Sequence, residues 1–412
     1  MSNTERRGWI IVASLFVTLF LVFGGGFDTA GVFFTPLLKH FGWRRAQLST
    51  LAGAASIAAG ASAPFIGWLL DRIEARIVIV AGAVTTALAF FAASRADSFA
   101  AMLAAYVVMG VGATASTTMP CSIVIANWFG ARRGIALGVA LAGTSLGGTG
   151  MTIVANYVVA RHGWRGGYVA MAVPMLVIVV PLIILTVRSR PPDSAPASAA
   201  SDAPRIELPG LEIRDAVRCR SFWMISIADF MFAAVGGGAV LHLISYLIGI
   251  GYSASFAAGM MSLVFLFTSV GKLAMGLFAD RVSARIALAL DFTLAGVGIA
   301  LALGAHNRIC LAAFVAVFGL TLGAPLVLVP MVMADSMGLR RLGSVMGLSA
   351  IFATIGGALG PVLAGRIFDV SGSYAVALEM FALMSVVAGG GAFMCLPLEV
   401  EQSRRALAAA AA

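Results

Sequence analysis

The sequence predicts an all-α membrane protein with twelve transmembrane helices in two six-helix bundles. Of the 412 residues, 60% are hydrophobic and 11% are charged, whereas about a quarter of the residues in soluble domains are charged. The chain contains twelve apolar stretches, and about 20 apolar residues suffice to cross a hydrocarbon core. These runs are continuous, which disfavours a transmembrane β-barrel with its alternating strands.

The spans are expected in order along two halves of the chain. The first run is too long for a cleaved signal peptide, so we interpret it as a retained span. Six spans form a bundle within residues 1–188, six form a second bundle within 221–398, and residues 399–412 form a cytoplasmic tail. The twelve spans lie near residues 9–38, 48–70, 77–94, 99–127, 134–160, 166–187, 221–250, 255–279, 286–304, 309–334, 343–367 and 374–397.

Residues 189–220 are expected to form a cytoplasmic linker between the bundles. The segment is rich in Pro, Ala, Ser and charge, a composition that cannot bury a core. Its end, residues 211–220, is compatible with a short amphipathic helix on the membrane surface, although a solvated linker is the favoured interpretation.

The net charge of +9 is explained by the membrane and indicates no nucleic-acid partner. With the N-terminus inside, 18 of the 27 Lys and Arg residues lie on the side of both termini and 8 lie on the other side. The remaining cation, Lys272, lies within a span. By the positive-inside rule, both termini are expected in the cytoplasm, with the protein in the cell membrane.

The two halves repeat a loop motif. Residues 67–77 read GWLLDRIEARI and residues 276–286 read GLFADRVSARI, an offset of 209 residues. Glycine triplets at 24–26 and 236–238 lie in the first span of each half, where they permit close helix contact or local unwinding. A repeated half is a common transporter architecture.

These paired loops resemble the signature of the major facilitator superfamily. Four further stretches, residues 31–46, 127–138, 241–246 and 270–276, resemble the monocarboxylate porters and the oxalate/formate antiporters. The resemblance implies alternating access between two bundles. It also implies that the loop residues act as a conformational latch: Asp71, Arg72, Asp280 and Arg281.

Lys272 is the leading candidate for substrate binding. A charge in the middle of a span costs at least about 2.5–3.5 kcal/mol without compensation. By resemblance, it occupies the position of an arginine that grips the substrate carboxylate. The alternative is a permanent ion pair with Asp229 or Asp28. Span eleven has no Lys or Arg before Arg366, whereas the oxalate antiporter has a second cation there, so a monocarboxylate is favoured over a dicarboxylate.

Asp28 and Asp229 are the candidates for proton coupling, together with Lys272. A carboxylate in a low-dielectric cavity can load a proton. The alternative for Asp28 is a charge partner or a polar residue that faces the periplasm. His242 can change charge near neutral pH or simply pack through hydrogen bonds. Further candidates to line the cavity are the polar residues Tyr246, Asn156, Tyr157, Thr117 and Thr118, for which interhelical hydrogen bonding is the alternative.

Two other acids, Asp291 and Glu379, lie in spans that face away from the cavity in this superfamily. We therefore expect structural pairing or interface exposure for both. The four cysteines lack metal-ligand spacing, and no nucleophile elbow, phosphate-binding glycine loop or HExxH motif is present. We expect no metal, no cofactor and no enzymatic activity.

The predicted function is proton-coupled symport of a small, lactate- or pyruvate-like monocarboxylate by a monomer in the lipid bilayer. Exchange of organic anions and export of amphipathic compounds are the alternatives. A sensor or scaffold is disfavoured because the loops leave little room for a signalling domain.

Overall fold

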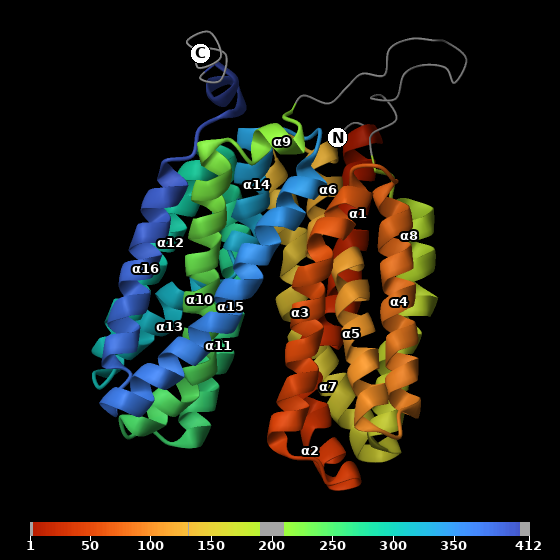
Figure 1. Cartoon of the computed structure of the whole chain (residues 1–412), viewed down its shortest axis with the longest axis vertical. Coiled ribbons are helices and arrows are strands. Elements are labelled where there is room, and N and C mark those ends of the chain that lie inside the picture. Colours follow the sequence, from red (N-terminus) through yellow and green to blue (C-terminus); the bar gives the residue numbers. More distant parts are fainter. Residues whose placement is uncertain (1–2, 131, 190–209, 404–412) are drawn as a thin grey trace. The chain divides into compact units, whose positions relative to one another are not determined.

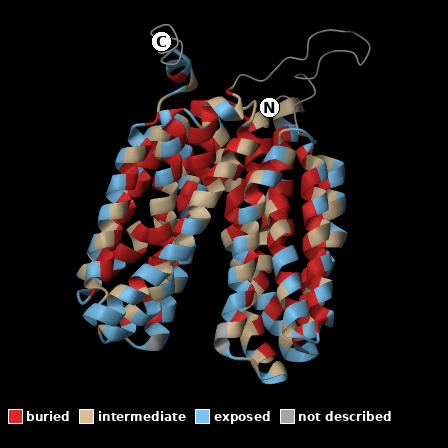
Figure 2. Cartoon of the chain, in the orientation of Figure 1, coloured by how far each residue is buried: buried red, intermediate tan, exposed pale blue. Residues whose placement is uncertain are grey.

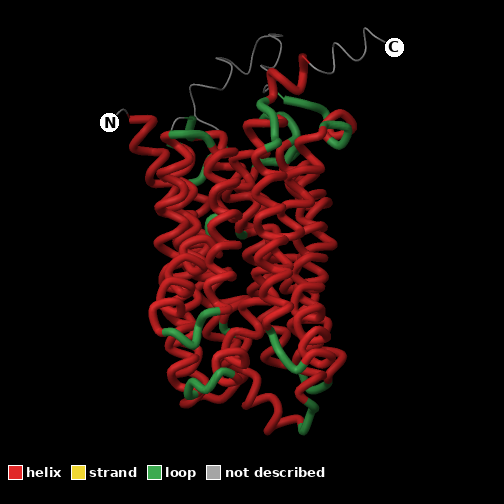
Figure 3. The backbone as a smooth tube through the Cα atoms, turned by 90° about the vertical axis from the view of Figure 1, so that its left-hand side faces the viewer, coloured by secondary structure: helices red, strands yellow, loops and turns green. Residues whose placement is uncertain are grey.

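The computed structural model describes residues 3–130, 132–189 and 210–403. This part of the chain consists of helices joined by short loops, with one isolated β-bridge between Gly210 and Gly338 (Figures 1 and 3). It divides into two compact units. The first contains residues 1–130, 139–208 and 346–348, and the second contains residues 131–138, 209–345 and 349–412.

The first unit contains the helices of the first half of the chain. Figure 2 shows buried residues along these helices, and most of the buried residues are apolar. The elements are α1 (Asn3–Thr18), η1 (Leu19–Asp28), α2 (Ala30–Phe41), α3 (Arg45–Leu70), α4 (Ala75–Arg95), α5 (Phe99–Ser116), α6 (Thr118–Trp128), α7 (Arg133–Pro174), η2 (Met175–Val179) and α8 (Val180–Thr186). The start of α7, up to Gly138, is grouped with the second unit.

The second unit contains the helices of the second half. Its elements are α9 (Ile213–Ala216), α10 (Arg220–Gly249), α11 (Ala254–Arg281), α12 (Ala284–Leu303), α13 (Arg308–Leu322), α14 (Pro325–Met337), α15 (Leu342–Ser371) and α16 (Ala375–Phe393). Residues 346–348 of α15 are grouped with the first unit.

The described helices account for the twelve expected spans. Ten helices are long and apolar enough to cross a membrane, and the bent pair α13–α14 makes an eleventh. One of the ten runs over 54 residues, from Arg133 to Thr186, but Gly163 inside it has φ 69° and ψ 178°. This glycine is required because a left-handed φ is costly for other residues, and it divides the long helix into two spans.

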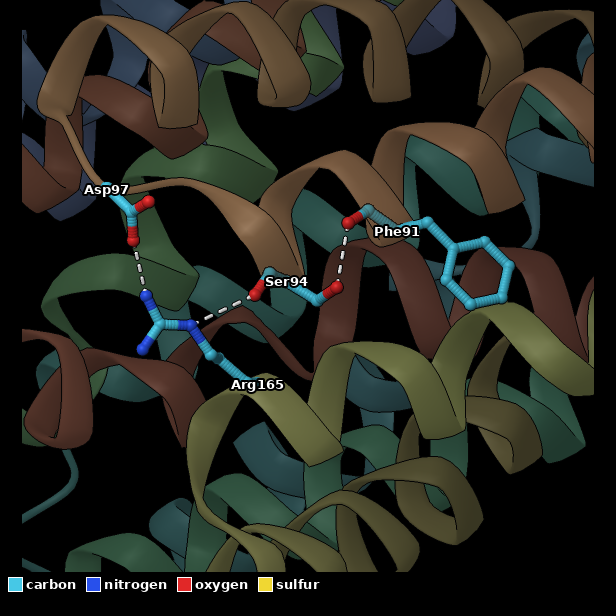
Figure 4. A network of polar contacts seen from close by, with 4 residues as sticks. All are labelled: Phe91, Ser94, Asp97 and Arg165. Carbon is cyan, nitrogen blue, oxygen red and sulfur yellow. Dashed lines mark hydrogen bonds and ion pairs between the residues drawn. The ribbon is translucent and has the colours of Figure 1, made fainter.

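Arg165 fixes the start of the second of these two spans. Its Nε donates to the carbonyl oxygen of Ser94 at 3.2 Å, and its Nη2 donates to Asp97 Oδ1 at 2.5 Å (Figure 4). The Ser94 hydroxyl donates in turn to the carbonyl of Phe91. The end of α4 and its loop are thereby held against the turn at Gly163.

Both glycine triplets lie at close helix contacts. In the first unit, a methyl group built on Gly24 would lie 2.3 Å from the backbone of Gly147. In the second unit, a methyl group built on Gly237 would lie 2.8 Å from the carbonyl oxygen of Gly357. Small residues allow such approach of helix backbones within the membrane. The triplets therefore make the same kind of contact, between the first and fifth spans of each half.

The end of the linker packs against the second unit. The N–H of Leu211 donates to the carbonyl of Met337 at 2.9 Å, and the Glu212 carboxylate pairs with Arg340 at 3.1 Å and Arg341 at 3.0 Å. The only helix among the described residues 211–219 is the single turn α9. Residues 190–209, the rest of the expected linker, lie outside the described part of the chain.

Candidate functional site

Lys272 lies deep in the span formed by α11. Only 2% of its surface is exposed, and its position eight residues before Asp280 places it about 12 Å along the helix from that loop. A methyl group built on Gly323 would lie 2.7 Å from Lys272 Cε. Glycine at position 323 therefore leaves space for the aliphatic part of the Lys272 side chain.

The fourth span of each half is interrupted near its middle. Thr117 separates α5 from α6 with φ −112° and ψ −125°, and α13 and α14 meet at an angle of 41° across Gly323 and Ala324. The repeat offset of 209 residues carries Thr117 to Leu326, next to the second break. Interrupted helices at matching positions of two halves are typical of transporter substrate sites. The sequence analysis did not predict these breaks.

The two candidate proton carriers lie in different units. Asp28 is the last residue of η1, a π-helical segment that includes the first glycine triplet; its side chain lies outside the described part of the structure. Such π-helical segments are frequent at functional sites. Asp229 lies half-buried in α10 of the second unit.

His242 and Tyr246 lie together in the second unit, where both line a small cavity. The cavity has a volume of about 20 Å³, room for about one water molecule, and its surface is almost wholly apolar. The Tyr246 hydroxyl donates to the carbonyl of Ala302. Lys272 does not line this cavity, so the structure separates this pair from the leading candidate.

His242 has a hydrogen-bond partner on each ring nitrogen. Nε2 lies 3.0 Å from the carbonyl oxygen of Pro361, and Nδ1 lies 3.0 Å from the hydroxyl of Tyr374. A carbonyl oxygen can only accept, so Nε2 donates to Pro361 and, in the neutral ring, Nδ1 accepts from Tyr374.

The other polar candidates form hydrogen bonds within their own helices or lie at the surface. Thr117 Oγ1 donates to the carbonyl of Ala113 at 2.7 Å, and Asn156 Nδ2 donates to the carbonyl of Thr152 at 3.0 Å. Thr118 is half-buried. Tyr157 is 55% exposed, with the guanidinium of Arg161 at 4.3 Å from its ring centre.

The two aspartates of the repeated loops lie at helix ends. Asp71 caps the C-terminus of α3, and the neighbouring guanidinium of Arg72 lies 4.1 Å from the ring centre of Trp68.

Within the second unit, the Asp280 carboxylate accepts hydrogen bonds from the N–H groups of Gly134 at 2.6 Å and Ile135 at 2.8 Å. Both donors lie in the first turn of α7, where a negative charge is favoured by the exposed N–H groups and the helix dipole. Arg281, the last residue of α11, is exposed.

Asp291 corrects one expectation from the sequence. It is fully buried, with 0% of its surface exposed, and neither carboxylate oxygen has a hydrogen-bond partner among the described residues. It is therefore neither paired nor at an exposed interface, whereas Glu379 in α16 is exposed. Hydropathy cannot separate these two cases, because it does not give the face of a helix on which an acid lies.

Sequence relatives cover almost the whole chain. The Major Facilitator Superfamily model matches residues 15–268 and 250–411. Monocarboxylate transporter 13 of Bos taurus is 27% identical over 392 residues, covering 95% of this chain and 89% of its own. An MFS-type transporter of Gibberella moniliformis is 26% identical over 345 residues, covering 83% and 80%.

Solved structures share the fold at low sequence identity. The fucose:proton symporter of E. coli superposes with a TM-score of 0.72 at 16% identity, covering 92% of this chain and 97% of its own. The human organic anion transporter MFSD10 gives 0.72 at 14% identity, covering 95% and 100%. Together with the spans, the repeated loops and the matched interrupted helices, these similarities show that the chain is a multi-pass membrane transporter that belongs to the Major Facilitator Superfamily.

Proposed function

We propose that the protein cotransports a small monocarboxylate with a proton by alternating access. The observation that carries the proposal is the burial of Lys272, 2% exposed in a membrane span, beside the interrupted tenth span. A buried ammonium is stabilised by negative groups close to it. In the loaded state, we expect the substrate carboxylate to contact Lys272.

Two further observations favour a carboxylate with a single charge. The relatives named monocarboxylate transporter 13 are 26% and 27% identical to this chain. The only Lys or Arg residue in α15, the eleventh span, is Arg366, which lies in the last two turns of that helix. One deep cation in the second unit suits one carboxylate.

Asp28 or Asp229 is proposed to carry the proton. Protonation neutralises the carboxylate of the acid, and binding at Lys272 balances the charge of the transported anion. The loaded transporter therefore changes conformation at a lower free-energy cost than one with bare charges. The conformational latch is proposed to involve Asp71, Arg72, Asp280 and Arg281, and both termini are proposed to lie in the cytoplasm.

Transport in proteoliposomes tests this function. We expect labelled lactate or pyruvate to accumulate when an inward proton gradient is imposed, and to accumulate less without it. Lys272→Ala should abolish uptake. The matched control is Lys39→Ala, because Lys39 is the other lysine in the sequence and its side chain is exposed.

Two outcomes contradict the proposal. Undiminished uptake by Lys272→Ala excludes the lysine as the substrate cation. Uptake that requires an anion on the opposite side and ignores the pH gradient identifies an exchanger of organic anions.

A further inference from the structure

Asp291 is a buried carboxyl group that the proposed transport mechanism does not use. Its side chain is completely buried in α12, and neither oxygen has a hydrogen-bond partner in the described part of the chain. An ionised carboxylate can only accept hydrogen bonds, and leaving it without donors in an apolar interior costs several kcal/mol. The neutral acid avoids most of this cost.

The helix register places Asp291 level with the break between α13 and α14. A methyl group built on Gly298 of α12 would lie 3.0 Å from the backbone nitrogen of Phe318 in α13. Because the two helices follow each other through a short loop and run antiparallel, seven residues back along α12 correspond to seven residues forward along α13. These steps lead to Asp291 and Pro325, at the start of α14.

The internal repeat gives the same placement independently. At the repeat offset of 209 residues, Asp291 corresponds to Gly82 in α4 of the first half. A methyl group built on Gly82 would lie 2.7 Å from the carbonyl oxygen of Gly112 and 2.8 Å from Ala115, just before the break at Thr117. At the same offset, Gly112 corresponds to Thr321 and Ala115 corresponds to Ala324. These two residues lie on either side of Gly323 in the second break.

Few charged side chains of the neighbouring helices lie at the same depth as Asp291. Lys272 of α11 packs against Gly323, and Phe232, one turn after Asp229 in α10, stacks on Phe292 with ring centres 4.7 Å apart. The charged and titratable groups of α13, α14 and α16 lie toward the ends of those helices: Arg308, Cys310, Asp335 and Glu379. None of these groups forms a hydrogen bond with Asp291.

We propose that Asp291 is a proton-binding site inside the second unit. The carboxylic acid keeps its proton while the α13–α14 break is packed against it. When water reaches the carboxyl group, the O–H bond breaks, the proton passes to water and a carboxylate remains. The ligand is a proton because neither oxygen of Asp291 has a hydrogen-bond partner among the described residues, and these residues contain no group of acidic, histidine or cysteine side chains able to hold a metal ion. The inference does not depend on which substrate is carried.

The pH dependence of unfolding tests the site. The folded protein holds this proton, whereas in the unfolded chain an aspartate ionises near its ordinary pKa of about 3.9. The unfolding constant of the wild type should therefore rise with pH above about pH 4, relative to that of Asp291→Asn. The measurement is equilibrium unfolding of the full chain in mixed micelles.

Glu379→Gln is the matched control, because it removes an exposed acid from the adjacent span. It should keep the pH slope of the wild type. Parallel slopes for the wild type and Asp291→Asn would overturn the proposal. If the asparagine variant does not fold, Asp291→Leu replaces it, because a neutral acid in an apolar shell tolerates an apolar residue; failure of both variants to fold also overturns the proposal.

Infrared spectroscopy supplies a second readout. The wild type should show the carbonyl band of a protonated carboxylic acid at neutral pH, and Asp291→Asn should lack that component. Replacement of sodium by choline at constant pH should leave the band and the stability unchanged. Stabilisation of the wild type by sodium without a pH slope would show a metal cation as the ligand and contradict the proposal.

Discussion

The ring of His242 in α10 and the hydroxyl of Tyr374, which precedes α16, are joined by a hydrogen bond of 3.0 Å. The other ring nitrogen of His242 bonds to the carbonyl of Pro361 in α15. One histidine therefore connects three helices beside the small cavity of the second unit. Tyr374 lies between α15 and α16, and burial, with a further contribution from the Asp369 carboxylate, raises its pKa above the ordinary value.

Tyr374→Phe should lower the stability of the second unit by about 1 kcal/mol, because Nδ1 of His242 loses its donor.

The Tyr374→Phe variant should also change how the stability of the protein responds to alkaline pH. Above about pH 10, the unfolded chain loses the tyrosine proton while the folded chain retains it, so the wild type loses stability as pH rises. Thermal unfolding between about pH 9 and pH 11 should show a shallower decline in Tyr374→Phe. An unchanged decline relative to the wild type would contradict this account, and Tyr157→Phe is the control.

Gly360→Ala should destabilise the packing of α15 against α10. A methyl group at position 360 would lie 1.9 Å from the carbonyl oxygen of Ala234, so the two backbones must separate. We expect a loss of about 1–3 kcal/mol, measured as a lower thermal midpoint in detergent. The matched control is Gly390→Ala in α16, where nothing lies within 4 Å of the added methyl; it should be neutral or stabilising because alanine is the better helix former.

The apolar runs of the sequence were sufficient to predict the fold class, because each span needs a long uninterrupted stretch. The breaks at Thr117 and Gly323 were not predictable in the same way. The sequence around Thr117 contains no proline before the break. A close helix contact at the first glycine triplet was predicted only as one of two possibilities, because such a triplet is compatible with either close packing or unwinding, and η1 shows both.

Glu212→Gln should weaken the contact between the end of the linker and the α14–α15 loop, because it removes the ion pairs with Arg340 and Arg341. Each pair is about a third exposed, so its contribution to global stability is at most about 1 kcal/mol. The expected effect is local: faster hydrogen exchange at the Leu211 amide, which bonds to Met337 at 2.9 Å. High salt should speed the exchange in the wild type but not in the variant. The control is Glu399→Gln, because Glu399 is exposed and lies outside this contact. It should leave the exchange rate of the Leu211 amide unchanged.

Cys395 should resist alkylation in the folded protein. It follows α16, is fully buried, and burial raises the pKa of its thiol to about 12. At pH 8 only about one thiol in 10⁴ is then the reactive thiolate. Mass spectrometry after iodoacetamide treatment should show labelling of the half-buried Cys310 well before Cys395. Equal labelling rates in the folded protein would contradict the burial of Cys395.

The candidate site was predictable only in part. Lys272 stands out because a cation in an apolar run has a large energetic cost, and the sequence shows this directly. The hydrogen bonds of Tyr246 to Ala302 and of His242 to Pro361 were not predictable, since they join residues far apart along the chain. Asp291 was assigned the wrong surroundings for the same reason: the pattern gives its depth, not its neighbours.

Binding of lactate or pyruvate to the purified protein tests the role of Lys272 most directly. Calorimetric titration should detect binding by the wild type and by Lys39→Ala. Lys272→Ala should bind about 10- to 100-fold more weakly, because it loses a charge-assisted hydrogen bond. Lys272→Arg should retain binding, since it keeps the positive charge. Equal affinity in Lys272→Ala and the wild type would contradict the central claim that this buried ammonium holds the substrate carboxylate.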